Sequence, residues 1–149
     1  MRPPRSSTAF SSLLASSLSA AAVLALVCAA PAAADPDPVT PVIPEVPADP
    51  AVTVFADEPA IENAYPVRPQ AFSRLPDDRA VRLYFTSGTP QCYGASATVQ
   101  ERADDVVVSL RTGTLPGLGD RACILIALVG AIDVPLQQPL GARAVRSDV

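Results

Sequence analysis

The sequence predicts a small all-β domain, an antiparallel sandwich or partly open barrel of five or six strands, preceded by a disordered Pro-rich segment. Short segments with apolar residues at every second position follow one another from about Tyr65 onwards, which is the period of a half-buried strand. Turn-forming residues separate these segments, and none shows helical periodicity. Two cysteines, Cys92 and Cys123, lie in the same region and can close it with one disulfide bond.

The individual strands are predicted in chain order. Val52, Val54 and Phe55 favour a short edge strand. The segment 81–86 alternates between apolar and polar side chains, and the segments 93–100 and 106–111 do the same. An acidic turn at Asp104 and Asp105 separates the last two segments, so we expect them to form an antiparallel hairpin.

The C-terminal part of the chain predicts a central strand and a closing hairpin. Residues 122–132 are apolar on both faces, as in a strand covered on each side; a buried helix is the alternative, but the β-branched content favours a strand. Gly130 is expected to mark a bulge or bend within it. Residues 134–145 are expected to close the sheet as a hairpin. Its prolines should sit at strand ends or on an edge, and Gly141 should adopt positive φ.

The N-terminal residues 1–34 have the three parts of a secretory signal peptide. A basic start is followed by an apolar run over residues 13–30 and by small residues up to Ala34. Cleavage after Ala34 fits best, with cleavage after Ala30 or a retained membrane anchor as alternatives. Lipidation of Cys28, as in a bacterial lipoprotein, is a further alternative, but Val27 and Ala25 stand where such sites have a small residue and a leucine.

Residues 35–62 form an acidic Pro-rich linker with seven carboxylates and no basic residue, whereas residues 63–149 carry nine arginines and eight acids. Proline recurs at every third position from Pro38 to Pro50, which matches polyproline II and predicts a semi-rigid spacer that cannot join a sheet. A ligand for a proline-recognition domain is the alternative. The near-neutral domain lacks the basic patch that nucleic acid or anionic lipid requires.

We expect Cys92 and Cys123 to form a structural disulfide, because an exported domain of this size needs covalent support. The bond would tie the loop before Cys92 to the central strand that contains Cys123. Reactive thiols are the alternative, but the pair lacks the two-residue spacing of redox cysteines.

The succession "VRLYFTSGTPQCYG", "DDVVVSLRTG", "RACI" and "VPLQQPLGAR" resembles a domain of uncharacterised small secreted or surface proteins from high-GC Gram-positive bacteria. The resemblance covers roughly Ala80 to Val145. It implies an extracytoplasmic β-domain with one disulfide and a Pro-Leu-Gly turn followed by an arginine. It implies no activity and no active-site residues.

The sequence offers little equipment for catalysis, and we predict no enzyme activity, no cofactor and no metal site. Histidine and lysine are absent, which removes the common nucleophile-base pairs and the commonest zinc ligand. The pairs Asp77-Asp78 and Asp104-Asp105 are expected to form turns. A calcium site using Asp104, Asp105 or Asp120 lacks the alternating ligand spacing. The glycines of residues 112–121 do not open a helix, so this segment indicates a flexible surface loop and no phosphate site.

By exclusion, the sequence favours a secreted or cell-surface binding or structural module in the cell envelope. Its expected partner is an extracytoplasmic protein or a cell-wall polymer, not nucleic acid, with membrane contact only if the signal is retained or Cys28 is lipidated. A secreted protease inhibitor that inserts an extended loop into a protease cleft is the alternative. In both cases the candidate contact loop precedes the first domain cysteine and consists of Thr86, Ser87, Gly88, Thr89, Pro90 and Gln91.

Overall fold

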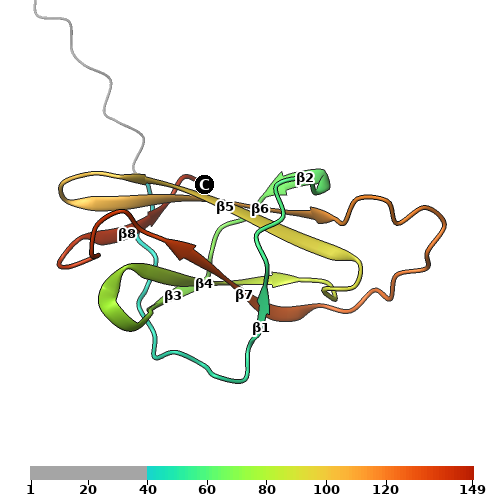
Figure 1. Ribbon diagram of the computed structural model, residues 1–149, viewed down its shortest axis with the longest axis horizontal. Helices are drawn as coiled ribbons and strands as arrows, with labels where there is room; N and C mark the ends of the chain where they lie inside the picture. Colours follow the sequence, from blue (N-terminus) through green and yellow to red (C-terminus); the bar gives the residue numbers. More distant parts are fainter. Residues whose placement is uncertain (1–39) are drawn as a thin grey trace, which may run out of the picture. The chain divides into compact units, whose positions relative to one another are not determined.

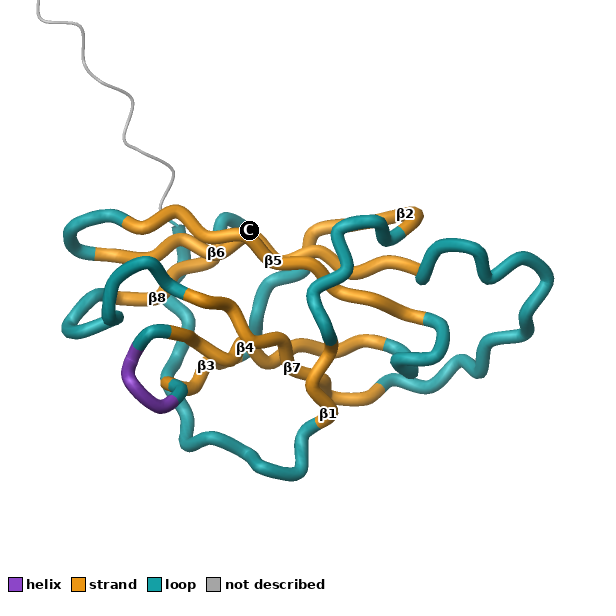
Figure 2. The backbone as a smooth tube through the Cα atoms, viewed as in Figure 1, coloured by secondary structure: helices purple, strands orange, loops and turns teal. Residues whose placement is uncertain are grey.

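A computed structural model describes residues 40–149, and it confirms the all-β prediction. Within these residues, eight strands form two sheets, and one short 3-10 helix lies between β3 and β4 in the chain (Figures 1 and 2). The predicted signal peptide and Cys28 lie outside the described residues. In chain order the elements are β1 (Thr53–Phe55), β2 (Glu62–Pro66), β3 (Ala71–Arg74), η1 (Pro76–Asp78), β4 (Ala80–Ser87), β5 (Tyr93–Glu101), β6 (Asp105–Thr114), β7 (Leu128–Pro135) and β8 (Ala144–Ser147).

The strands are arranged in two mixed sheets. The first sheet has the order β1-β7-β4-β3. In the second sheet, β6 pairs with β5 along one edge and with both β2 and β8 along the other. The β1–β7 and β6–β8 pairs are parallel and the remaining pairs are antiparallel. The sandwich therefore has more strands than the five or six expected, and it is not purely antiparallel.

The core lies between the two sheets, and the period of two correctly predicted which side chains enter it. Val81, Leu83 and Phe85 of β4 are fully buried, and the ring of Phe85 packs against Phe55 with centroids 5.4 Å apart. The second sheet contributes aliphatic side chains from β6, including Val108. Each such large side chain stabilises the fold by about 1.5–3 kcal/mol through burial. The alternating pattern therefore identifies the inner face of β4 and the main hairpin.

The hairpin predicted from residues 93–111 is confirmed. β5 and β6 pair in one unbroken antiparallel register from Tyr93 opposite Thr114 to Glu101 opposite Val106. The Arg102 N–H donates to the Asp105 carbonyl at 2.9 Å and closes the turn. The short edge strand expected at Phe55 is also present, as β1.

The predicted central strand begins six residues later than expected. β7 lies between β1 and β4 as a central strand should, but it starts at Leu128, and residues 122–127 form a loop. Its partner strand explains the difference, because β4 ends at Ser87, opposite Leu128. Residues before Leu128 therefore have no neighbouring strand to pair with, whatever their β-propensity.

Gly130 does not mark a bulge or bend, because the β4–β7 register runs through it without a shift. A Cβ at this position would lie only 2.4 Å from Cε2 of Phe55. The glycine therefore makes room for the Phe55 ring to reach the core.

The closing hairpin expected over residues 134–145 is wrong. Val134 belongs to β7 in the first sheet, whereas β8 pairs in parallel with β6 of the second sheet. The chain between them crosses from one sheet to the other. Pro135 ends β7, as a residue without a backbone donor should, and Gly141 adopts the expected positive φ of 57°.

The expectation that the Pro-rich linker cannot join a sheet is wrong from Thr40 onwards. Ile43 is buried, and its N–H donates to the Val145 carbonyl of β8. Three residues later, the Val46 N–H donates to the Phe72 carbonyl of β3, and the carbonyls of Pro41 and Pro44 accept from Ser147 and Phe72. The prolines alternate with these donors and supply only acceptors, so residues 41–46 can join β8 to β3 along one side of the sandwich.

Candidate functional site

The disulfide between Cys92 and Cys123 is present, as predicted from the sequence, with the two Cα atoms 6.0 Å apart. Cys92 is only 4% exposed and lies immediately before β5. Cys123 lies in the loop between β6 and β7, not in a strand as expected. The bond therefore fixes a long loop to the edge of the core, and we call this loop, residues 115–127, the apolar loop.

The predicted contact loop consists of the end of β4 and the turn that follows it. Thr86 and Ser87 are the last residues of β4, and Ser87 is buried. The Thr89 carbonyl accepts hydrogen bonds from the N–H groups of Cys92 and Tyr93, which folds the following residues into a turn. The extended strand therefore ends at Ser87, and residues 90–92 form a turn before β5.

Three consecutive aliphatic side chains of the apolar loop face solvent. Ile124, Leu125 and Ile126 are 61%, 91% and 51% exposed. Few backbone hydrogen bonds restrain the loop: the Leu115 N–H donates to the Cys92 carbonyl, and the Arg121 N–H donates to the Leu118 carbonyl. The loop therefore presents an apolar surface whose position depends on the disulfide.

A recess of about 360 Å³ lies between the apolar loop and the predicted contact loop. Leu125 and Ile126 line one side, and Tyr65 of β2, itself 54% exposed, lines another. The remaining lining residues are Thr86, Ser87, Gly88, Tyr93 and Ala127. Half of the predicted contact loop thus belongs to a larger surface, which we call the loop end of the sandwich and define by residues 65, 86–88, 93 and 124–127.

Sequence reasoning missed the apolar loop because its composition is that of a buried strand. Residues 122–127 contain no charged side chain, and two of them are isoleucine. Only the register of β4 against β7 shows that these residues extend beyond the sheet. The one usable sequence signal is the position of the apolar run directly after a disulfide cysteine and a Gly-rich turn.

The aspartate pair at residues 77–78 forms a turn, as expected. Both residues have positive φ, at the end of η1. The carboxylate of Asp78 accepts from the Gly141 N–H and from Arg74, each at 2.8 Å. The Gly141 N–H, more than the Arg74 guanidinium, holds the pKa of Asp78 below its ordinary value. This carboxylate therefore holds Gly141 of the crossing segment against Arg74.

Glu101 and Arg143 organise the same crossing segment. Glu101 accepts from the backbone N–H groups of Gln137 and Gln138, and pairs with Arg143 at 2.9 Å. The Gln137 N–H is the largest cause of the lowered pKa of Glu101. Arg143 also donates to three carbonyls of the segment, those of Gln138, Pro139 and Leu140. The arginine after the Pro-Leu-Gly turn therefore fixes the crossing between sheets.

The remaining aspartates considered as metal ligands do not form a cluster. Asp105 pairs with Arg146 at 3.3 Å, and Asp104 uses its carbonyl to accept from Ala144. Asp120 lies in the apolar loop. Residues 40–149 contain no group of three or more Cys, Asp or Glu side chains arranged around a possible ion.

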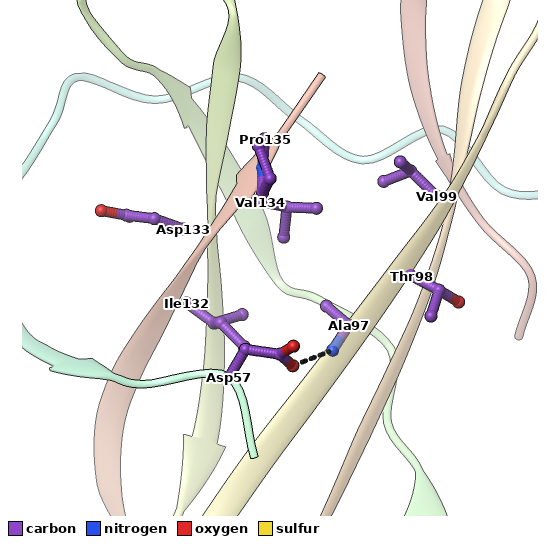
Figure 3. Close-up of a pocket in the computed structure, with 8 residues that line it drawn as sticks. All are labelled: Asp57, Ala97, Thr98, Val99, Ile132, Asp133, Val134 and Pro135. Atoms are coloured by element: carbon purple, nitrogen blue, oxygen red, sulfur yellow. Dashed lines mark hydrogen bonds between the residues drawn. The ribbon is translucent and has the colours of Figure 1, made fainter. Parts of the chain in front are cut away.

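A second cavity, of about 300 Å³, opens between the edges of β5 and β7 (Figure 3). It is lined by Ala97 and Val99 of β5 and by Ile132 and Val134 of β7. Asp57 lies at one end, where its carboxylate accepts a hydrogen bond from the Ala97 N–H. The other lining residues are Thr98, Asp133 and Pro135. We call this cavity the edge groove.

No protein-family model matches the chain, and no curated protein or solved structure matches it significantly. Among residues 40–149, no helix is long and apolar enough to cross a membrane. The disulfide indicates that the domain folds in an oxidising, extracytoplasmic environment.

Proposed function

We propose that the protein is a secreted or surface-attached, non-enzymatic binding module that contacts an extracytoplasmic protein through its loop end. The exposure of Ile124, Leu125 and Ile126 beside a disulfide carries this proposal. Three consecutive aliphatic side chains in solvent are unfavourable for an isolated domain, and contiguous exposed apolar surface is typical of protein interaction sites. A partner that covers these side chains removes their apolar surface from water, which contributes favourably to the binding free energy.

The chemistry of the loop end favours a protein over a cell-wall polymer as the partner. Leu125 and Ile126 offer no hydrogen-bonding groups, whereas a glycan must be recognised largely through its hydroxyl groups. Tyr65 and Tyr93 line the adjacent recess, and aromatic rings with a polar tip are enriched in protein interfaces. The disulfide supports binding further, because a restrained loop loses less conformational entropy when it binds.

The non-enzymatic part of the proposal rests on how the acidic groups are used. Asp78, Glu101 and Asp133 each pair with an arginine of the domain. The sequence has no histidine or lysine to act as a general base. Secretion is supported by the disulfide and by the signal-like residues 1–34, whose cleavage remains a prediction.

The proposal is tested by capture of envelope proteins on the immobilised protein. Leu125→Ser and Ile126→Ser should each abolish capture of the partner, whereas Val54→Ser, a matched change at a 43% exposed valine of β1, should leave it intact. Reduction of the disulfide should also lower capture. Equal capture by the loop variants and Val54→Ser would overturn the proposal, and sedimentation with purified wall polymer alone would assign the polymer as partner instead.

A further inference from the structure

The two lateral sides of the sandwich are closed to different extents. On one side, residues 41–46 bond to β8 of the second sheet and then to β3 of the first sheet, so that one extended segment bridges both edges. On the opposite side, β1 pairs with β7 as far as Phe55 opposite Ile132 and then crosses to β5, where Asp57 pairs with Ala95. Beyond this crossing, residues 133–135 of β7 pair only with β4, and residues 97–99 of β5 pair only with β6. Their outer edges meet no other strand among residues 40–149.

The free edge of β5 carries backbone groups that point away from the second sheet. In an antiparallel pair, alternate residues direct their N–H and C=O groups toward the partner strand. The bond from the Leu115 N–H to the Cys92 carbonyl shows which residues these are: the backbone N–H and C=O groups of even-numbered β5 residues point toward β6. Those of odd-numbered β5 residues therefore point outward. Ala95 is covered by the Glu58 N–H, and Ala97 donates to the Asp57 carboxylate. The outward groups of Val99 remain for another strand.

The edge of β7 across the groove is less suited to strand addition. Pro135 has no N–H to donate. The β7 edge contributes apolar side chains instead: Ile132 and Val134 belong to the core and also line the groove. An extended segment on β5 would therefore direct alternate side chains between the sheets, against these two residues.

Charge at the groove indicates one further property of its occupant. Asp133 points away from the cavity and pairs with Arg82 through two hydrogen bonds of 2.7 and 2.9 Å (Figure 3). Asp57 forms no ion pair with any arginine among residues 40–149. Its carboxylate therefore leaves a negative charge, without a cationic partner, at one end of an apolar groove.

We propose that the edge groove binds an extended, basic peptide segment of a protein partner by adding it as a strand to β5. Main-chain hydrogen bonds to Val99 supply affinity, an aliphatic side chain fills the cavity against Ile132 and Val134, and a neighbouring arginine or lysine pairs with Asp57. The segment completes this side of the sandwich as residues 41–46 complete the other. This site is separate from the loop end and does not depend on it.

The test uses a blocked heptapeptide in which valine alternates with threonine and one arginine, titrated into the isotopically labelled protein and followed by NMR. We expect saturable shifts centred on the Val99 amide and slower hydrogen exchange at that amide. Val99→Phe should abolish binding by filling the groove. Asp57→Asn, which keeps the oxygen that accepts from Ala97, should weaken binding of the arginine peptide about two- to fivefold. It should leave a glutamine-substituted peptide unaffected.

The matched control is Asp120→Asn, an exposed aspartate of the apolar loop, which should not change affinity. Absence of a saturable shift at Val99 with peptide at about 1 mM would overturn the proposal. Shifts centred on the apolar loop would also overturn it, and so would concentration-dependent shifts at Val99 without peptide, since these would identify a second copy as the occupant. Should Val99→Phe fail to fold, the Asp57→Asn comparison with the two peptides decides alone.

Discussion

Removal of the Cys92–Cys123 bond tests how the apolar loop contributes to stability. The substitution Cys123→Ala breaks the bond at its loop end and leaves the buried Cys92 sulfur in place, so little core packing is lost. The bond spans 31 positions, and the chain-entropy relation gives about 3.7 kcal/mol for a closed loop of that length. Because the apolar loop regains native-state freedom once released, this value is an upper bound. We expect a loss of about 2–3.7 kcal/mol.

The assay is equilibrium urea unfolding of the oxidised protein, the reduced protein and Cys123→Ala, followed by far-ultraviolet circular dichroism. The reduced protein and the variant should unfold at the same lower urea concentration, and their native spectra should match that of the oxidised protein, because no strand contains Cys123. A loss below about 1 kcal/mol would refute the entropic argument. A loss of β-signal in the native spectrum would refute the placement of Cys123 outside the sheets.

Three further changes test the packing, the crossing segment and the loop end by the same unfolding measurement. Gly130→Ala places a Cβ against the Phe55 ring and should cost about 1–3 kcal/mol; an unchanged unfolding midpoint would contradict the tight approach. Glu101 has a lowered pKa, so its stabilising contribution is present above the unfolded value of about 4.3 and is lost as pH falls through the folded value. Glu101→Gln should therefore flatten the acid side of the stability profile, and an unchanged slope below about pH 4.5 would contradict this. Leu125→Ser alters a residue that is 91% exposed and should change stability by less than about 0.5 kcal/mol, whereas a larger loss would mean that the loop packs on the domain.

The fold class, the main hairpin and β4 could be predicted because their information is local. The alternation around Leu83 and the turn before Val106 specify inward and outward faces without reference to the rest of the chain. Pairing of the two domain cysteines was also predictable, because residues 35–149 contain only two cysteines and so have one intramolecular disulfide available. Asp78 was correctly assigned to a turn for a similar local reason.

Other features depended on partners distant in the sequence. The ends of β4 and β7 coincide at Ser87 and Leu128, and this pairing alone turns the apolar residues after Cys123 into an exposed loop. The edge groove likewise exists only because β1 leaves β7 after Phe55 and crosses to the other sheet. Neither event has a signature in local composition.

By itself, the sequence determined that this chain is an all-β, disulfide-closed domain with no histidine or lysine, because periodicity, cysteine count and composition are properties of the chain alone. Only the tertiary structure decided where apolar side chains meet solvent and which strand edges stay unpaired. Burial and pairing are relations between segments. Leu125 is exposed, and Ile43, which lies between Pro41 and Pro44 in the sequence, is buried in the core, because of what lies beside each one in space.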